Sequence, residues 1–431
     1  MKIFLYTIVL LFGISACKSK KAVINTTEIE ILLKDYKPSP SIKENEDDLL
    51  FWKSRIDSKN IDAVNLPKYA AALSLRFKIQ GDINDLLAAD SIYQLLDKHF
   101  LGKEAAYKIA QISSSLMQHK FVAADSFLQQ ANKLGIGEYE KSALSFDVYF
   151  ETGNTEYAFF ELAKIKNYKD YNFMFRNAKI FHYNGNVDSA VANMQAASDI
   201  AMQSKNIPLA QSAISNTADL LLHNGDLQKA KELYLQSITL NNTDLHSFMG
   251  LGTIAMLHDK NDMLAEKIFK FIQTKTKQPD VIFKLAQLNM QSGDSIAAKK
   301  YATEFVTITS NKNYGNMYNK YLIQLYTSIL NNPIAAEKIA LQELESRNTP
   351  QTNAWYVYTL LKNNKLLEAN KIYEKNVSGK PLEGLESFWM GKYMQANNKG
   401  YNANEFFKNA QKNKYDLAPD AIKELADMKL E

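Results

Sequence analysis

Cysteine is nearly absent from this chain of 431 residues. Its one cysteine is Cys17, which excludes an intramolecular disulfide. Proline and glycine are scarce, with 9 and 16 residues, and this composition predicts a folded, helix-friendly chain without a disordered tail. An excess of one charge is also missing, because 51 Lys and Arg accompany 47 Asp and Glu. The net charge of +4 therefore does not indicate a basic surface for binding nucleic acid.

Catalytic and cofactor-binding motifs are missing as well. The chain has no H-E-x-x-H, no G-x-S-x-G and no Gly-Lys-Ser/Thr phosphate loop. One superficial match to a dinucleotide loop, Gly250-x-Gly252-x-x-Ala255, lies inside an expected helix, whereas the motif must follow a strand. We therefore predict a protein that is not an enzyme and needs no cofactor.

The histidines invite a metal hypothesis. Four of them fall near the ends of different expected helices: His119, His182, His223 and His258. A partial positive charge suits a helix C-terminus, so four separate helix-end residues are the favoured interpretation and one zinc site is the alternative. We predict no metal.

The N-terminus carries the sharpest local signal. Lys2 precedes an apolar run over residues 3–14 that is shorter than the roughly twenty residues a membrane-spanning helix needs. This pattern predicts a targeting segment, residues 1–16, that is cleaved. The tetrad Ile14-Ser15-Ala16-Cys17 resembles the bacterial lipobox, and the resemblance implies a diacylglyceryl anchor on Cys17. An ordinary secretory signal that happens to contain cysteine is the alternative.

The residues after Cys17 bear on location. Lys18 stands where an Asp resembles an inner-membrane retention signal, and no acidic run resembling a surface-export signal follows. An outer-membrane lipoprotein that faces the periplasm is therefore expected. Residues 17–44, with Pro38 and Pro40, are predicted to be the lipidated cysteine and a tether.

An internal repeat dominates the rest of the chain. A turn residue, a spacer, an apolar residue, two spacers and an alanine recur, most clearly from Gly225 to Ala230. The recurring alanines are Ala89, Ala124, Ala158, Ala190, Ala230, Ala265, Ala298, Ala336, Ala369 and Ala403. They follow one another at spacings near 34 residues, which predicts ten helix–turn–helix units.

This period and phrase resemble the tetratricopeptide repeat over residues 69–414. The resemblance also rests on Gly252 within a first helix and on an aromatic residue four places after several alanines, as in Tyr234 and Phe269. It implies an all-α, right-handed superhelical solenoid of about ten repeats. Residues 45–68 are expected to lead into the array, with a helix over 45–58, and residues 415–431 to form a C-terminal capping helix.

The resemblance implies a scaffold or adaptor that binds a protein or peptide partner in its inner groove. The groove positions counted along the first helices are Phe175, His182, Ser215, Leu222, Met249, Met256, Phe283, Met290 and Leu322. Core packing of these side chains is the alternative. A glycan- or small-ligand-binding lipoprotein that acts with an outer-membrane transport channel is the rival function, with tyrosines and tryptophans as stacking platforms.

Overall fold

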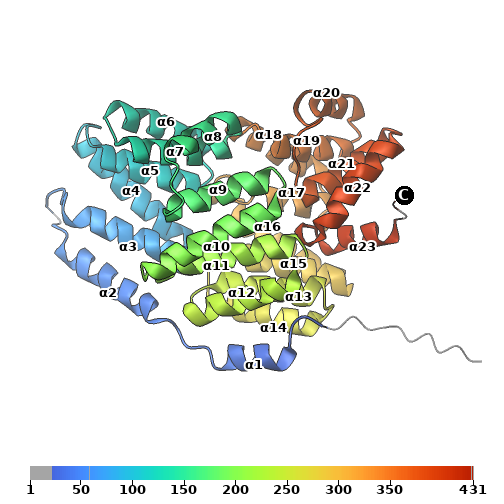
Figure 1. The fold of residues 1–431 in the computed structure, drawn as a ribbon, viewed down its shortest axis with the longest axis horizontal. Helices are drawn as coiled ribbons and strands as arrows, with labels where there is room; N and C mark the ends of the chain where they lie inside the picture. Colours follow the sequence, from blue (N-terminus) through green and yellow to red (C-terminus); the bar gives the residue numbers. More distant parts are fainter. Residues whose placement is uncertain (1–21, 58, 429, 431) are drawn as a thin grey trace, which may run out of the picture.

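Figure 1 shows the computed structural model of the chain, which describes residues 22–57, 59–428 and 430, without the side chains of residues 400 and 401. In that part the chain forms 23 α-helices, two short 3-10 helices and no β-strand. Twenty of the helices pair into ten successive hairpins, each packed on its neighbours in the chain. The predicted fold class is confirmed: the protein is an all-α helical-repeat solenoid.

Each hairpin has a first and a second helix. The first helices are α3 (Asn65–Gln80), α5 (Ala105–Met117), α7 (Glu138–Glu151), α9 (Tyr171–Tyr183), α11 (Ile207–His223), α13 (Leu245–Leu257), α15 (Asp280–Ser292), α17 (Asn319–Thr327), α19 (Pro350–Lys362) and α21 (Gly384–Ala396). The second helices are α4 (Ile83–His99), α6 (Phe121–Lys133), α8 (Thr155–Lys164), α10 (Val187–Gln203), α12 (Leu227–Leu240), α14 (Asp262–Gln273), α16 (Ser295–Thr309), α18 (Pro333–Ser346), α20 (Leu366–Asn376) and α22 (Gly400–Lys412). Outside the hairpins lie α1 (Thr26–Lys34), α2 (Pro40–Arg55), η1 (Lys312–Tyr314), η2 (Lys414–Asp416) and α23 (Pro419–Asp427).

The turn inside every hairpin contains one residue with a left-handed backbone, at φ between 47° and 86°. Half of these residues are glycine and half are not, and they are Gly81, His119, Gly153, Gly185, Gly225, Lys260, Gly293, Asn331, Asn364 and Asn398. This conformation ends the first helix and reverses the chain. The variable turn residue of the repeat thus has one structural role in all ten units.

The recurring alanines are the points of closest helix packing. All ten lie on second helices and are at most 1% exposed. The aromatic residue four places on packs against a first helix: a Cβ atom built on Gly250 would lie 2.2 Å from the Tyr234 ring, and one on Gly252 would lie 2.5 Å from Phe269. Side chains larger than hydrogen would therefore force these helices apart. Both glycines lie within α13 rather than in a loop that follows a strand.

The N-terminal segment differs from the predicted tether. Residues 26–34 form α1, which lies against α14 (Figure 1). Both oxygens of the Asp259 carboxylate accept backbone N–H groups, from Val23 and from Ile24, at 2.8 Å each. Ile29 of α1 is fully buried. The sequence alone did not indicate this docking, because its partners lie more than 200 residues away.

The solenoid closes on itself through contacts between distant units. Lys277, ahead of α15, donates its backbone N–H to Gln80 at 2.8 Å and pairs with Asp82 at 2.7 Å. At the other end, α23 packs on α15, and η2 packs on α11. The closure places the ends of the middle first helices against the C-terminal units, and the cavities lie there.

Candidate functional site

Two adjoining cavities lie where α9 and α11 meet the C-terminal units. We call the first the central pocket, of about 410 Å³, and the second the charged pocket, of about 310 Å³. They share four lining residues: His182, Tyr183, Gln351 and Glu383. Residues from hairpins far apart in the sequence therefore line one continuous surface, and the four shared residues are all polar.

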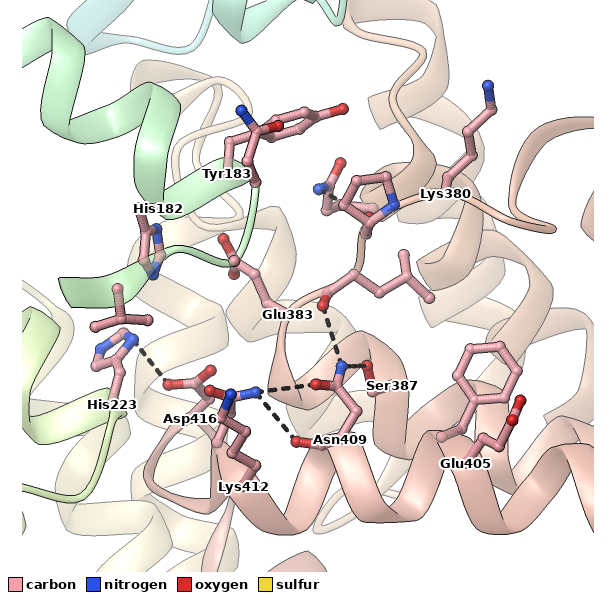
Figure 2. A pocket seen from close by; sticks show the side chains of 18 residues that line it. His182, Tyr183, His223, Lys380, Glu383, Ser387, Glu405, Asn409, Lys412 and Asp416 are labelled. Atoms are coloured by element: carbon pink, nitrogen blue, oxygen red, sulfur yellow. Dashed lines mark hydrogen bonds and ion pairs between the residues drawn. The ribbon is translucent and has the colours of Figure 1, made fainter. Parts of the chain in front are cut away.

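In the central pocket, an ion pair joins the two walls. The Nδ1 atom of His223, at the end of α11, lies 2.9 Å from Asp416 of η2, as Figure 2 shows. The other Asp416 oxygen accepts the backbone N–H of Gly384 at 3.2 Å. Asn409 of α22 donates to Ser387 at 2.6 Å and so orders the opposite wall. The pocket thus presents imidazole, carboxylate and amide groups whose positions are held by neighbours.

The charges around His223 shift its titration. Burial lowers its pKa, but Asp416, Asp219 and Glu383 outweigh burial and raise the pKa of His223 to about 9. His182 lies alongside, with the two rings 6.3 Å apart, and burial lowers the pKa of that second histidine. At neutral pH His223 is therefore charged and His182 is neutral.

We expect the His223–Asp416 pair to loosen at high pH. Because the pKa of His223 is raised in the folded state, its stabilisation is complete below the ordinary value near 6.5 and is lost as pH rises through about 9. The midpoint of unfolding, compared between wild type and His223→Gln, should differ at about pH 7 and converge towards about pH 10. A difference that stays constant over this range would contradict the pairing.

The charged pocket holds a lysine and a buried glutamate. Glu386 is fully buried, and its Oε1 atom lies 3.2 Å from the Lys320 ammonium and accepts the Trp355 indole N–H at 2.7 Å. Burial raises the pKa of Glu386, while Lys320 opposes that change. Its second oxygen has no hydrogen-bond donor among the described residues. On the other wall Arg347 lies 3.5 Å from Glu151.

A third cavity of about 390 Å³, the tyrosine pocket, lies between α11, α13, α15 and α17. His246 pairs with Asp219 at 2.7 Å, and Tyr318 donates its hydroxyl to Asp280 at 2.9 Å. Lys284 of α15 also lines this pocket, and burial lowers the pKa of its ammonium group to about 8. Asp219, whose pKa is held low by His246 and Tyr234, is the fixed negative charge of this pocket.

The predicted groove residues separate into two sets. Five of them, at most 5% exposed, are Ser215, Leu222, Met256, Phe283 and Leu322. Phe175, His182 and Met249 are partly buried, and Met290 is 39% exposed. His182 lines the central and charged pockets, whereas Leu222, Met249 and Phe283 line the tyrosine pocket.

Burial of these five side chains favours core packing at their positions, which is the alternative interpretation, and the partner groove stays a hypothesis. At Phe283 the covering element comes from closure of the solenoid, because the start of α23 lies against α15. Pro419 and Asp420 leave a gap of only about 10 Å³ beside Phe283 and Met290. The remaining positions keep their predicted role as a hypothesis.

Sequence reasoning missed the C-terminal contribution to the pockets. Glu383, Asp416 and Asn409 belong to segments that count as the end of the array in the linear pattern. One signal was available: Lys320 and Glu386 are charged residues inside first helices that are otherwise largely apolar. Such charges are seldom buried unless they are paired, so each of the two residues indicated a partner of opposite charge, which only the structure identifies.

The described residues show neither a metal-binding cluster nor a membrane-spanning helix. That part of the chain holds no group of three or more His, Cys, Asp or Glu side chains placed to bind a metal ion. None of its helices combines the length and apolar character that a membrane crossing requires. Cys17 and the predicted signal segment lie outside the described residues.

The tetratricopeptide-repeat sequence model matches residues 213–244. Among solved structures, a tetratricopeptide repeat protein from Parabacteroides merdae is 15% identical, with 59% of this chain and 96% of that chain covered and a TM-score of 0.35. Yeast Tom70 is 11% identical, with 93% and 96% covered and a TM-score of 0.41. Pseudomonas aeruginosa PilF is 14% identical, with 49% and 94% covered and a TM-score of 0.37.

These structural similarities concern fold alone and carry no functional inference. A comparison with curated proteins found no match. What this chain shares with the repeat is the hairpin phrase, and the matched segment contains Ala218 and Ala230, both fully buried. The chain is therefore an all-α solenoid of helical hairpins in which residues 213–244 match the tetratricopeptide repeat.

Proposed function

We propose that this protein is a lipid-anchored scaffold of the bacterial cell envelope that faces the periplasm and binds a partner protein. Helical-repeat solenoids are commonly protein-binding scaffolds, which supports the scaffold role. The lipobox-like tetrad ending at Cys17 supports the anchor and the location. A diacylglyceryl group on Cys17 supplies the membrane attachment.

The observation that carries the binding role is the polar surface shared by the central and charged pockets. Cavities of this size accept a small molecule or a short extended peptide. Side-chain amides on the walls, from Gln351 and Asn409, offer both donors and acceptors to a peptide backbone. We therefore propose an extended segment of the partner as the occupant, rather than an amphipathic helix.

Photo-crosslinking tests this site. A photoreactive amino acid at Gln351, inside the pocket, should crosslink one defined partner in intact cells. The matched control is the same group at Glu232, an exposed position on α12, which should give no such product. Crosslinking of that partner from Glu232 but not from Gln351 would place the binding site elsewhere.

The anchor has a separate test. Cys17→Ser removes the only thiol, so we expect loss of acylation, loss of cleavage after Ala16 and accumulation of the precursor. Mass spectrometry of the N-terminal peptide measures both modifications. A Cys17→Ser chain that is cleaved and retained in the membrane fraction like the wild type would refute lipid anchoring.

The tyrosine pocket supports a second candidate, binding of a glycan or another small polar ligand. Tyr321 stacks on Phe283 at 4.5 Å between ring centroids, next to the carboxylates of Asp219 and Asp280. Aromatic faces beside hydrogen-bond acceptors suit a polyhydroxylated ligand. The tryptophans do not contribute, because Trp355 and Trp389 are at most 4% exposed and Trp52 does not line this pocket. A glycan-binding screen with Asp280→Asn as the control tests this candidate.

A further inference from the structure

A row of large apolar side chains stands in solvent along one edge of the solenoid. It consists of the second residue of four consecutive second helices: Met263 (84% exposed), Ile296 (85%), Ile334 (76%) and Leu367 (82%). We call this row the apolar edge. Single exposed apolar residues are ordinary, but recurrence at one position of four successive repeats is a surface feature.

The repeat itself does not require an apolar residue at this position. The three preceding hairpins carry polar residues there, all exposed: Glu156, Asp188 and Gln228. Packing therefore cannot explain the four apolar side chains, because the same place accepts charge in neighbouring units.

A lysine lies one helical turn behind each apolar residue. The four lysines, all exposed, are Lys267, Lys300, Lys338 and Lys371. Residues four apart share a helix face, and one turn separates them by about 6 Å along the axis. Lys267 pairs with Glu30 of α1 at 2.7 Å, whereas the other three make no ion pair within the described residues.

Three of the acidic residues at this edge are already engaged by protein groups, whereas Glu266, beside Lys267, is exposed. Asp262 accepts from Gln291 at 2.5 Å, Glu337 pairs with Lys365, and Glu368 accepts the hydroxyl of Tyr356 at 2.9 Å. Within the part of the chain that the structure describes, Lys300, Lys338 and Lys371 remain unpaired and exposed, one helical turn after the residues of the apolar edge. This combination suits an anionic lipid surface, with apolar groups at the acyl boundary and lysines at the headgroups.

The N-terminal segment reaches the same edge. Asp259, which holds the backbone of Val23 and Ile24, lies in the turn that leads into α14, four residues before Met263. Five peptide bonds join Cys17 to Ala22, and such a stretch spans at most roughly 18 Å. An acyl chain on Cys17 would therefore enter a bilayer close to the apolar edge.

We propose that the apolar edge is a membrane-contacting surface that docks the solenoid on an anionic phospholipid bilayer. In part this rests on the proposed anchor at Cys17, which brings the bilayer to this side of the molecule. Docking here fixes one edge of the solenoid to the membrane, so that the orientation of the whole array follows from four side chains and their lysines.

Vesicle binding of a chain without lipid tests the proposal. A chain that starts at Lys18 retains all described residues, and we expect it to sediment with vesicles of phosphatidylglycerol and phosphatidylcholine. Changing Met263, Ile296, Ile334 and Leu367 together to serine should lower the partition coefficient more than tenfold. Circular dichroism and the melting temperature should stay unchanged, because all four side chains are exposed.

The matched control is the triple change Glu156→Asp, Asp188→Glu and Gln228→Asn, which alters the same position in three other units without changing the net charge and should leave binding unchanged. Lys300→Glu, Lys338→Glu and Lys371→Glu together should weaken binding to the anionic vesicles. Equal binding by the four-serine variant and the wild type, or no binding of the wild type, would overturn the proposal. Neither result bears on acylation, because this chain lacks Cys17. The lipid anchor is tested separately by the Cys17→Ser variant of the full chain.

Discussion

Replacing Lys320 with methionine is expected to lower the free energy of unfolding by about 3 kcal/mol, the lower end of the range for breaking a buried ion pair. The change leaves the carboxylate of Glu386 fully buried without its cation, which lies 3.2 Å away in the wild type. The lower end applies because the Lys320 side chain is itself 34% exposed to the pocket. Guanidinium-induced unfolding measures the loss.

Two further results would identify the cause. Lys320→Met combined with Glu386→Leu should recover most of the lost stability, because the orphaned charge is removed as well. In Lys320→Met alone, burial keeps the pKa of Glu386 above its unfolded value near 4.5, so its charge destabilises the fold at higher pH. The deficit should therefore shrink as pH falls towards that value. A Lys320→Met deficit that is independent of pH would contradict this explanation.

Phe283→Ala is expected to destabilise the fold by about 3–5 kcal/mol, the range for removing a buried phenylalanine. The Phe283 ring is 4% exposed, stacks on Tyr321 at 4.5 Å and lies 5.7 Å from the Phe305 ring. Phe175→Ala, at a partly buried position of the same register, should cost roughly 1–2 kcal/mol. Thermal and chemical unfolding of both variants measure the difference.

This pair of variants also decides between the two interpretations of the predicted groove. If Phe283→Ala left the melting temperature unchanged and weakened partner binding instead, the side chain would be a surface anchor, and the closed arrangement of α15 and α23 would be wrong in solution. Loss of stability with retained binding through the central pocket is the expected outcome.

The repeat could be predicted from the sequence because its cause is local. A small residue such as Ala230 lets two adjacent helices approach, and Tyr234 fills the groove one turn later, so the hairpin geometry depends on residues within one period. The same locality explains why histidines such as His223 were correctly placed at helix ends. Neither inference required knowledge of distant contacts.

The candidate site could be predicted only in part. His182 was identified as a groove residue, and it does line two pockets. Its neighbours Glu383 and Asp416 come from segments about 200 residues further along the chain. Nothing in the period specifies that these segments return to α9 and α11, so the polar character of the site could not be anticipated. The methionine-rich groove was predicted by counting positions along the first helices, and this count contains no information on contacts between distant units.

The sequence by itself determined the hairpin, its period and the number of units, since each depends on side chains that touch within a unit or its neighbour. Only the tertiary structure decided that the solenoid closes, that the backbone ahead of α1 binds Asp259 and that His223 meets Asp416. The physical reason is accumulation: a small rotation between successive hairpins, summed over ten units, determines which distant residues meet. The ion pair between Lys277 and Asp82 depends on that sum and not on any single repeat.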